Sequence, residues 1–390
     1  MQNHSTKNRV CVIAPYCPAD RDGLKSLGGA AKMSAVIQGM GENNFQVLLV
    51  NSGHQLEISK CTSVKRTKIG SQSCIEVEPP TIRKRSIGKL LQCFIAPLVM
   101  ARIVYRWKPD YLWIYNSYLF EVICLCVAKL ASPGLVTILE LEDLPNARRR
   151  ERERLTKNIL DRFALKVALK IVNGATVVQK KMTPFNGGHQ LEWYLPVLLS
   201  NAEIDGPIKV RNPITIGYFG GLMEEKGVII LISLIRQYRG CCRWVVCGSG
   251  PLERELETLS VAIPDRFRFF GCLEDQQFRA VYREVDAIIN LHQPIEKFAG
   301  SLFPYKLLEA VAHGKLVIST PMLGCPDEAS HAIHWLDGDP FEAGLNALAR
   351  IEEIELETRA ARNQAQKWVV ANFSSRSAIG RILHDLQSVS

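Results

Sequence analysis

The fold is indicated most directly by one stretch, Ile214-Thr-Ile-Gly-Tyr-Phe-Gly-Gly-Leu-Met-Glu-Glu-Lys-Gly227. Its first six residues form a short apolar run typical of a buried parallel strand. The glycine turn that follows leads into a helical apolar face that includes Leu231, Ile232 and Ile235. Because a strand, a turn and an amphipathic helix in succession are the repeating unit of doubly wound sheets, the stretch predicts one unit of an α/β fold.

The same alternation extends along the whole chain in two series. In the first half we predict strands at Val10–Ala14, Phe45–Val50, Tyr111–Tyr115, Leu135–Leu139 and Thr176–Gln179; after Ile214–Phe219 we predict them at Trp244–Cys247, Phe267–Phe270, Ala287–Leu291 and Leu316–Ser319. Glycine and proline breakers between Pro196 and Pro213 separate the series. We therefore expect two doubly wound Rossmann-like domains, residues 1–200 and 201–375. A ligand that they share would lie in a cleft, at the carboxyl ends of the strands.

The composition is that of a folded globular protein. The chain has 390 residues, of which 47% are hydrophobic and 22% charged, and a net charge of +9. This charge is compatible with anionic small molecules, an anionic membrane surface or nucleic acid, and it does not choose among them. The 12 cysteines include no Cys-x-x-Cys pair, so we expect reduced thiols and no metal site.

The termini and apolar segments predict a cytoplasmic protein without a membrane span. Met1 to Arg9 is polar and has no signal-peptide core, and the apolar runs are shorter than the ~20 residues that a span needs. Arg83-Lys84-Arg85, with Lys89, precedes an apolar segment and could contact anionic lipid at the inner face of the cell membrane. The second basic stretch, Arg148–Lys157, is more typical of a solvated helix.

Two glycine turns of the second half are candidates for binding phosphate. Gly220 and Gly221 allow close approach of the backbone, and Lys226 places a positive charge near a helix start. A surface turn with a solvated lysine is the alternative. Gly248, in Val245-Val-Cys-Gly-Ser-Gly-Pro-Leu-Glu253, ends a strand in a fingerprint that lacks its third glycine. It is weak as a nicotinamide site but suits a strand end that faces a nucleotide.

The densest motif is Ser301-Leu-Phe-Pro-Tyr-Lys-Leu-Leu-Glu-Ala-Val-Ala-His-Gly314. Pro304 predicts a helix that starts close to it. Lys306 and Glu309 are three residues apart and share a face, so the cation can meet phosphate while the carboxylate accepts ribose hydroxyls. This pattern favours a nucleoside diphosphate, with a solvated Lys–Glu pair as the alternative.

Candidates in the first half follow two predicted strands. Gly28 and Gly29 precede the apolar helical face Met33–Met40 and can approach a phosphate or sugar, unless they are only a flexible loop. Glu140, Glu142 and Asp143 follow the strand Leu135–Leu139, where carboxylates can orient or deprotonate acceptor hydroxyls.

Taken together, these motifs resemble the GT-B glycosyltransferases of family four, also described as glycosyl transferases group 1. The resemblance rests on the turn at Gly220-Gly221 with Lys226-Gly227, on Gly248-Ser-Gly-Pro-Leu, on Phe269-Phe-Gly271 and on the helix of Glu309. Gly28-Gly29 matches the family's N-terminal glycine loop. The stretch Asn372 to Leu386 is similar to the closing helix that returns to the first domain, for which we expect residues 376–390.

The resemblance implies a metal-independent, retaining transfer of a hexosyl or related sugar from a nucleoside diphosphate donor, without a cofactor. The acceptor would be a glycan or a lipid-linked saccharide of cell-surface polysaccharide biosynthesis. As catalytic residues it implies Lys226, which would neutralise the leaving diphosphate, and Glu309, which would hold the ribose; we add Asp143. Contacts to the donor would come from Leu273, Ser301, Leu302, Phe303, Pro304, Lys306 and Leu307, besides the glycines named above. One departure is Ser301, which stands eight residues before Glu309 where the family has a second glutamate.

Three other functions remain open at this point. A GT-B-like sugar-nucleotide epimerase would bind the same donor and act on it without an acceptor. A non-catalytic GT-B-like binding protein would account for the missing carboxylate at Ser301. A nucleic-acid binder would show strong salt-dependent binding, whereas we expect no nucleic-acid partner.

Overall fold

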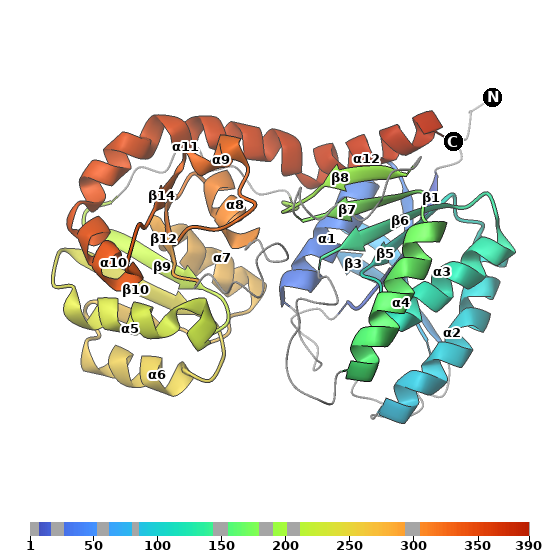
Figure 1. The fold of residues 1–390 in the computed structure, drawn as a ribbon, viewed down its shortest axis with the longest axis horizontal. Coiled ribbons are helices and arrows are strands. Elements are labelled where there is room, and N and C mark those ends of the chain that lie inside the picture. The colour runs from blue at the N-terminus through green and yellow to red at the C-terminus, as the bar shows by residue number, and fades with distance from the viewer. Residues whose placement is uncertain are drawn as a thin grey trace. The chain divides into compact units, whose positions relative to one another are not determined.

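The computed structural model describes residues 8–16, 27–52, 62–79, 86–142, 155–178, 190–200, 211–292 and 305–389. The chain divides into two compact units. Unit 1 comprises residues 1–201 together with 373–390, and unit 2 comprises residues 202–372. Each unit contains one sheet covered by helices (Figure 1).

The sheet of unit 1 has eight strands in the order β3-β4-β2-β1-β5-β6-β7-β8. They are β1 (Arg9–Ala14), β2 (Gln46–Asn51), β3 (Ser63–Ile69), β4 (Gln72–Glu78), β5 (Tyr111–Tyr115), β6 (Val136–Leu141), β7 (Gly174–Val177) and β8 (Leu191–Tyr194). Neighbouring strands are parallel except for the antiparallel hairpin β3–β4. All five residues of the apolar strand β5 are buried, as expected for a central parallel strand.

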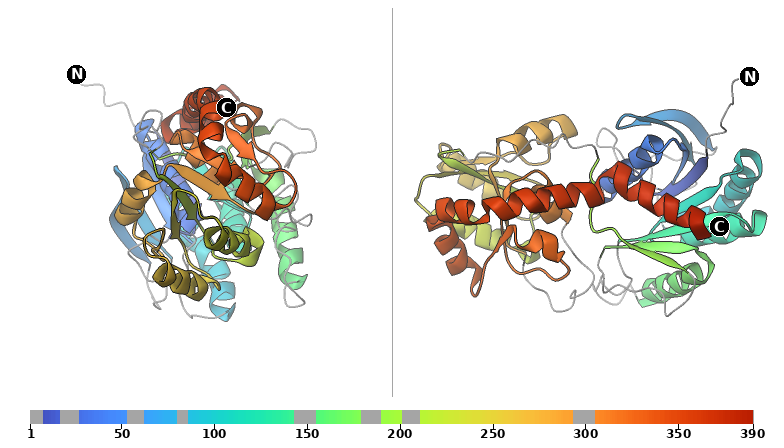
Figure 2. Two further views of the ribbon diagram at one scale, coloured as in Figure 1. Left: turned by 90° about the vertical axis from the view of Figure 1, so that its left-hand side faces the viewer. Right: turned by 90° about the horizontal axis from the view of Figure 1, so that it is seen from above.

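In the described part of unit 1, this sheet is flanked by the helices α1 (Leu27–Glu42), α2 (Ser86–Trp107), α3 (Leu119–Ala131), α4 (Leu155–Ile171) and α12 (Ser375–Val389). Helices α2, α3 and α4 lie side by side over one face, and α12 packs against α1 (Figures 1 and 2). The α1–α12 contact is close, because a Cβ on Gly39 would lie 2.4 Å from the carbonyl oxygen of Ser375. Asn43 Nδ2 donates to the carbonyl of Arg376 at 3.0 Å. The last helix of the chain is therefore an integral part of unit 1.

The sheet of unit 2 is parallel throughout, with the order β11-β10-β9-β12-β13-β14. Its strands are β9 (Ile214–Phe219), β10 (Cys242–Cys247), β11 (Phe267–Phe269), β12 (Ala287–Asn290), β13 (Leu316–Ser319) and β14 (Ile333–Trp335). Its helices are α5 (Val228–Gln237), α6 (Glu253–Ala262), α7 (Asp275–Glu284), α8 (Tyr305–Ala312), α9 (Asp327–Ser330), α10 (Pro340–Ala349) and α11 (Ile351–Phe373). The order reverses between β9 and β12, and ligands of doubly wound sheets bind at such a switch point.

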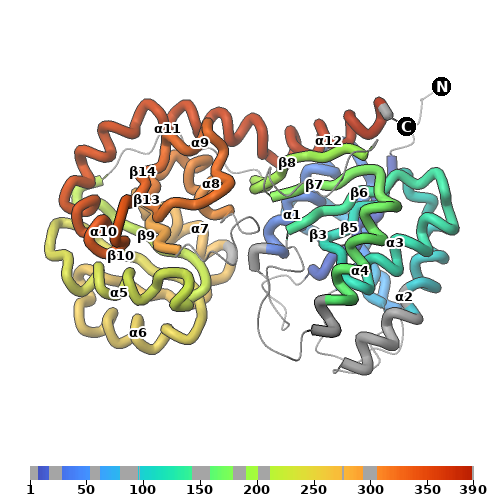
Figure 3. Tube along the Cα trace, viewed as in Figure 1, coloured from blue at the N-terminus to red at the C-terminus, as the bar shows by residue number. Residues whose placement is uncertain are grey.

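The two faces of this second sheet are covered differently. On one face, Tyr218, Trp244 and Phe267 form a core with α5, α6, α10 and α11, whose paths Figure 3 traces. On the other face, Phe219 packs against Phe278 of α7 with ring centres 5.3 Å apart. Alternation along β10 therefore sends Trp244 into the first core and its neighbour Arg243 to the opposite side, where it is exposed.

The predicted α/β architecture and the ten predicted strands are confirmed, with ends shifted by a few residues. The sequence did not predict the hairpin β3–β4, whose first strand is mostly polar and exposed at the sheet edge, nor the short strands β8 and β14. The nine described cysteines are free thiols. Among the described residues, no helix is long and apolar enough to span a bilayer, and no cluster of side chains could hold a metal ion.

Candidate functional site

Two glycine turns meet at the carboxyl edge of the sheet of unit 2. Gly220 follows β9 with φ 148°, and Gly248 follows β10 with φ 150°. A Cβ on Gly248 would lie 1.9 Å from the carbonyl oxygen of Gly220, and the amide of Gly220 donates to the carbonyl of Cys247 at 3.1 Å. The turns therefore pack backbone against backbone, which only glycine at 248 permits.

Lys226 is held beside the end of the neighbouring strand β12. It closes the 3-10 turn η2 (Glu224–Lys226), and the next residue, Gly227, has φ 75°. A Cβ on Gly227 would lie 1.9 Å from the carbonyl oxygen of Leu291, so this turn is pressed against the chain that leaves β12. Lys226 Nζ lies 2.9 Å from Nε2 of His292. The Lys226 side chain is thus directed to the switch point between β9 and β12.

His292 is a site residue that the sequence analysis missed. It is buried, and its carbonyl oxygen accepts a hydrogen bond from Thr320 Oγ1 at 2.6 Å. That bond ties the carboxyl end of β12 to that of β13. A polar residue directly after a buried strand was the signal that would have identified it.

Lys306, in the first turn of α8, lies near the same glycines. A Cβ on Gly220 would lie 3.7 Å from Lys306 Nζ, and Nζ lies 4.6 Å from the ring centre of Tyr218. Burial, together with the charge of Lys226, lowers the pKa of Lys306 to about 7. Two lysines 80 positions apart in the sequence therefore lie within electrostatic reach of each other, with Lys306 beside Gly220, where an added anion would favour the charged form of Lys306.

Glu309 lies one turn further along α8 and is partly buried. Burial raises the pKa of this carboxyl to about 7, although Arg279 acts in the opposite direction. Tyr282, whose pKa burial and the charge of Glu309 raise, has a buried hydroxyl without a hydrogen-bond partner in the described part of the chain. No ion pair joins Lys306 and Glu309 among the described residues. The two side chains are therefore not a solvated surface pair.

The other predicted donor residues have more varied positions. Gly221 is partly exposed, and its carbonyl accepts from the Tyr218 hydroxyl at 3.0 Å. Leu307 is fully buried, so that only its main chain could meet a ligand, and Leu273 is partly buried in the loop after β11. Five predicted site residues lie outside the described part of the chain: Asp143, Ser301, Leu302, Phe303 and Pro304. So do the basic stretches 83–85 and 148–154.

In unit 1, the predicted glycine pair stands where expected, at the start of a helix. Gly28 and Gly29 belong to the first turn of α1. Lys32, one turn on, is buried; it donates to Glu142, and its Nζ lies 3.2 Å from Glu140 Oε1. Burial by itself lowers the pKa of Lys32, but the negative charges of Glu142 and Glu140 have a larger combined effect, so the pKa of the lysine is raised. The ion pairs therefore fix the start of α1 to the end of β6.

Besides Glu140, unit 1 contains a buried carboxyl that the sequence analysis did not predict, that of Glu121. Glu121, in the first turn of α3, is 3% exposed, and its Oε1 accepts from Ser52 Oγ at 2.7 Å. Burial raises its pKa to about 7. Ser52 directly follows β2, so the pair lies at the carboxyl edge of this sheet. Glu121 interrupts an apolar run, and this interruption was the available signal.

Two doubly wound sheets of this kind, one parallel throughout and the other parallel except for the hairpin β3–β4, define the GT-B fold. Solved structures agree over almost the whole chain. Sucrose-phosphate synthase from Thermosynechococcus elongatus matches 98% of this chain and 100% of its own, with 14% identity and a TM-score of 0.66. Anabaena HepE in complex with UDP matches 97% of this chain and 100% of its own, with 15% identity and a TM-score of 0.61. At these identities the likeness concerns the fold alone.

The particular family is indicated by the sequence of unit 2. Residues 213–350 match the family model of the glycosyl transferases group 1. The amylovoran biosynthesis glycosyltransferase AmsK of Erwinia amylovora is 25% identical over 187 residues, which is 46% of this chain and 46% of AmsK. The match thus spans about half the length of that curated relative. The resemblance to GT-B glycosyl transferases group 1 is therefore confirmed.

Proposed function

We propose that this protein is a retaining glycosyltransferase that moves a sugar from a nucleoside diphosphate to a glycan or lipid-linked acceptor. One observation carries the proposal, namely that Lys306 lies beside Gly220 and within electrostatic reach of Lys226 at the switch point of unit 2. A diphosphate there would meet two cations and the backbone of the glycine turn. HepE of Anabaena, which has the same fold, has been solved with UDP and with UDP-glucose.

In the proposed reaction, departure of the nucleoside diphosphate is the step that the site assists. Negative charge develops on the leaving phosphate oxygens, and Lys226 and Lys306 neutralise it. The proposal therefore assigns charge stabilisation to lysines rather than to a metal ion. Glu309 accepts ribose hydroxyls, for which its carboxylate form is required. The main chain of residues 301–304 contacts the donor, and Leu273 borders the nucleotide.

We assign the acceptor to the carboxyl edge of unit 1. Gly28 and Gly29 lie in the first turn of α1, and we assign their amides to a phosphate or a sugar of the acceptor. Asp143, which lies outside the described residues, is assigned the role of orienting or deprotonating the acceptor hydroxyl. Lys32 fixes the helix that carries both glycines. AmsK supports a role in cell-surface polysaccharide synthesis, since its name places it in amylovoran biosynthesis.

The proposal includes peripheral contact with the inner face of the cell membrane. Leu98 of α2 is 72% exposed, and Phe163 of α4 is 63% exposed. The basic residues Arg102 and Arg162 are exposed on the same two helices. Exposed apolar and basic side chains together suit an anionic lipid surface.

The experiment combines a binding screen with a transfer assay. Nucleoside diphosphates and their sugars, beginning with UDP-glucose, are screened by thermal shift, since a ligand at 100 times its Kd adds about 2.7 kcal/mol of stability. The ligand that binds is then incubated with and without a polysaccharide or lipid-linked acceptor pool. Acceptor-dependent transfer that is lost in Lys226→Ala and Glu309→Ala supports the proposal.

Each alternative has its own signature in the same assay. Interconversion of the sugar in the absence of any acceptor would identify an epimerase. Binding without turnover under all acceptor conditions would identify a non-catalytic protein. If no nucleotide or nucleotide sugar changes the Tm, the donor site as we describe it is wrong.

A further inference from the structure

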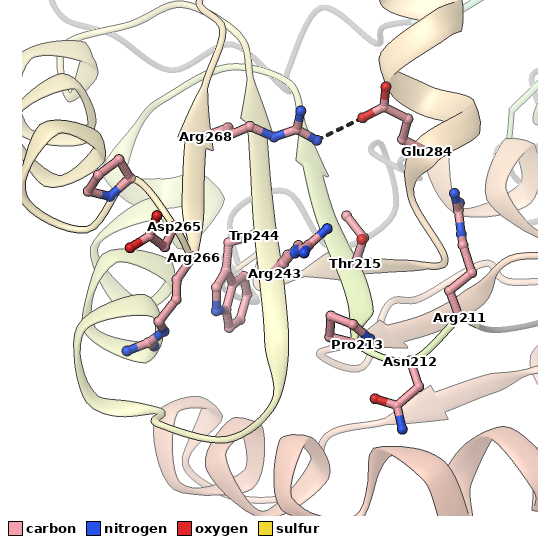
Figure 4. Close-up of a pocket in the computed structure, with 11 residues that line it drawn as sticks. Arg211, Asn212, Pro213, Thr215, Arg243, Trp244, Asp265, Arg266, Arg268 and Glu284 are labelled. Carbon is pink, nitrogen blue, oxygen red and sulfur yellow. Dashed lines mark hydrogen bonds and ion pairs between the residues drawn. The ribbon is translucent and has the colours of Figure 1, made fainter.

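A cavity of about 580 Å³ lies at the opposite edge of the sheet of unit 2, where the strands begin (Figure 4). Thr215, Arg243 and Arg268 line it from the first two residues of β9, β10 and β11. Gly248 lies five positions after Arg243, which at about 3.3 Å per residue is roughly 16 Å along the strand. The cavity is therefore separate from the glycine turns and their lysines.

The cavity exists because one part of the sheet face is polar and uncovered. Arg243 pairs in register with Thr215, and Arg268 pairs with Val245, so these side chains share the face opposite to the Trp244 core. Both faces of a parallel sheet are usually covered by helices and apolar. Here both arginines remain exposed. This part of the face thus has the chemistry of a binding surface rather than of a core.

The charge of the cavity is predominantly positive. Four arginines line it, at positions 211, 243, 266 and 268, against the carboxylates of Asp265 and Glu284. Glu284 accepts from Arg268 at 2.7 Å, as drawn in Figure 4. Arg211 Nε donates to the buried Asp286 at 2.9 Å, and its Nη2 donates to the carbonyl of Arg283 at 3.1 Å, so this guanidinium group is already engaged.

Arg243 is an arginine of the cavity whose charge is available. No hydrogen bond or ion pair to this side chain occurs in the described part of the chain, and Figure 4 shows it on β10, between Arg268 and Arg211. A guanidinium group presents a planar fork of N–H donors that matches a phosphate group. Arg243 therefore has the donors, and the cavity has the excess charge, for an oxyanion.

We propose that this cavity binds a phosphorylated small molecule, with its phosphate on Arg243 and Arg268. A volume of about 580 Å³ is within the range of small-molecule sites, of about 300–1,000 Å³, and accommodates a sugar phosphate. Pro264, which is exposed, adds apolar wall for the remainder of the ligand. The site goes beyond the proposed transfer reaction, because it needs neither the donor nor the acceptor.

Isothermal titration of the full chain with glucose 1-phosphate, in the presence of saturating UDP-glucose, tests the proposal. Inorganic phosphate serves as a second probe, which separates recognition of the phosphate from recognition of the sugar. Arg243→Gln should weaken the binding of glucose 1-phosphate at least tenfold. Arg243→Lys should weaken this binding less, since the lysine keeps the positive charge but lacks the planar fork of N–H donors. Both variants should fold, because the side chain is exposed.

Two controls make the outcome specific. Arg236→Gln removes an exposed arginine of α5 outside the cavity and should leave the affinity unchanged. Lys226→Gln, titrated without UDP-glucose, should also leave glucose 1-phosphate binding intact. A failure of the proposed donor site can therefore be distinguished from a failure of the cavity site. The proposal is overturned if the wild-type chain binds neither probe, or if binding is lost in Lys226→Gln but kept in Arg243→Gln.

Discussion

Donor binding should exchange protons with the solvent, and the direction of that exchange should reverse near pH 7. The pKa of Lys306 is about 7 in the free protein instead of its usual 10.5, and the pKa of Glu309 is about 7 instead of 4.5. A diphosphate beside Lys306 favours its charged form, and ribose hydroxyls that donate to Glu309 favour the carboxylate. Binding therefore returns both groups toward their ordinary pKa values.

The magnitude follows from these values. At pH 8, only about one tenth of Lys306 is protonated before binding and nearly all of it afterwards, while Glu309 has few protons to release. The complex should then take up about 0.8 proton. At pH 6, Lys306 is already charged, whereas Glu309 loses its proton, so about 0.8 proton should be released.

Isothermal titration in pairs of buffers with different ionisation enthalpies measures this number. UDP-glucose is a suitable ligand, because its diphosphate diester does not titrate between pH 6 and 8. Lys306→Met should abolish the uptake at pH 8 and keep the release at pH 6, and Glu309→Gln should do the reverse. Lys166→Met, which removes an exposed lysine of α4, is the matched control. Equal heats in both buffers at pH 8, or a proton number that does not vary with pH, would refute the reasoning.

Three further predictions concern other parts of the two units. Gly248→Ala should weaken the binding of UDP-glucose at least tenfold and lower the Tm, because the new Cβ would lie 1.9 Å from a carbonyl oxygen. The control is Gly271→Ala, where φ is 61° and no atom lies within 4 Å of the new Cβ; it should lower the free energy of unfolding in urea by only about 1–2 kcal/mol and leave UDP-glucose binding unchanged. Lys32→Met should lower the free energy of unfolding by about 3 kcal/mol, because it leaves the buried Glu140 without its cation. The double variant with Glu140→Gln should recover part of this loss, and an unchanged urea midpoint in Lys32→Met would contradict the prediction. Folding raises the pKa of Glu121 from 4.5 to about 7, so the free energy of unfolding falls as pH rises between these values. Glu121→Gln should therefore raise the free energy of unfolding at pH 8 by up to about 3 kcal/mol and leave it unchanged at pH 4. Thermal unfolding at both pH values measures the difference.

Buried parallel strands were predictable because both of their faces are apolar, which leaves continuous runs such as Tyr111–Tyr115 in the sequence. The edge strand β3 was not predictable, since it is mostly exposed and its sequence, Ser-Val-Lys-Arg-Thr-Lys-Ile, has the polar composition of a loop. The helix of Lys306 and Glu309 was predictable because helical spacing is local.

What the sequence did not contain is the set of partners that such residues acquire on folding. His292 reaches Lys226 across 66 positions, and the hydroxyl of Tyr282 lies in the surroundings of Glu309 only because α7 and α8 pack together. The shifted pKa values of Lys306 and Glu309 come from this burial, which no local pattern states. The arginine cavity was missed for the same reason, because its members begin separate strands.

The packing of α12 on α1 also determines when unit 1 can be completed during synthesis. Residues 375–389 are translated after the whole of unit 2, yet the helix that they form is the partner of α1, which is translated before most of unit 1. Until then, the surface of α1 around Gly39 has no partner, and the nascent chain must carry an unfinished N-terminal unit while the whole of unit 2 is translated. A fragment that stops at residue 201 would stay in that unfinished state, whereas joining residues 373–390 to it through a flexible linker should let the unit fold by itself.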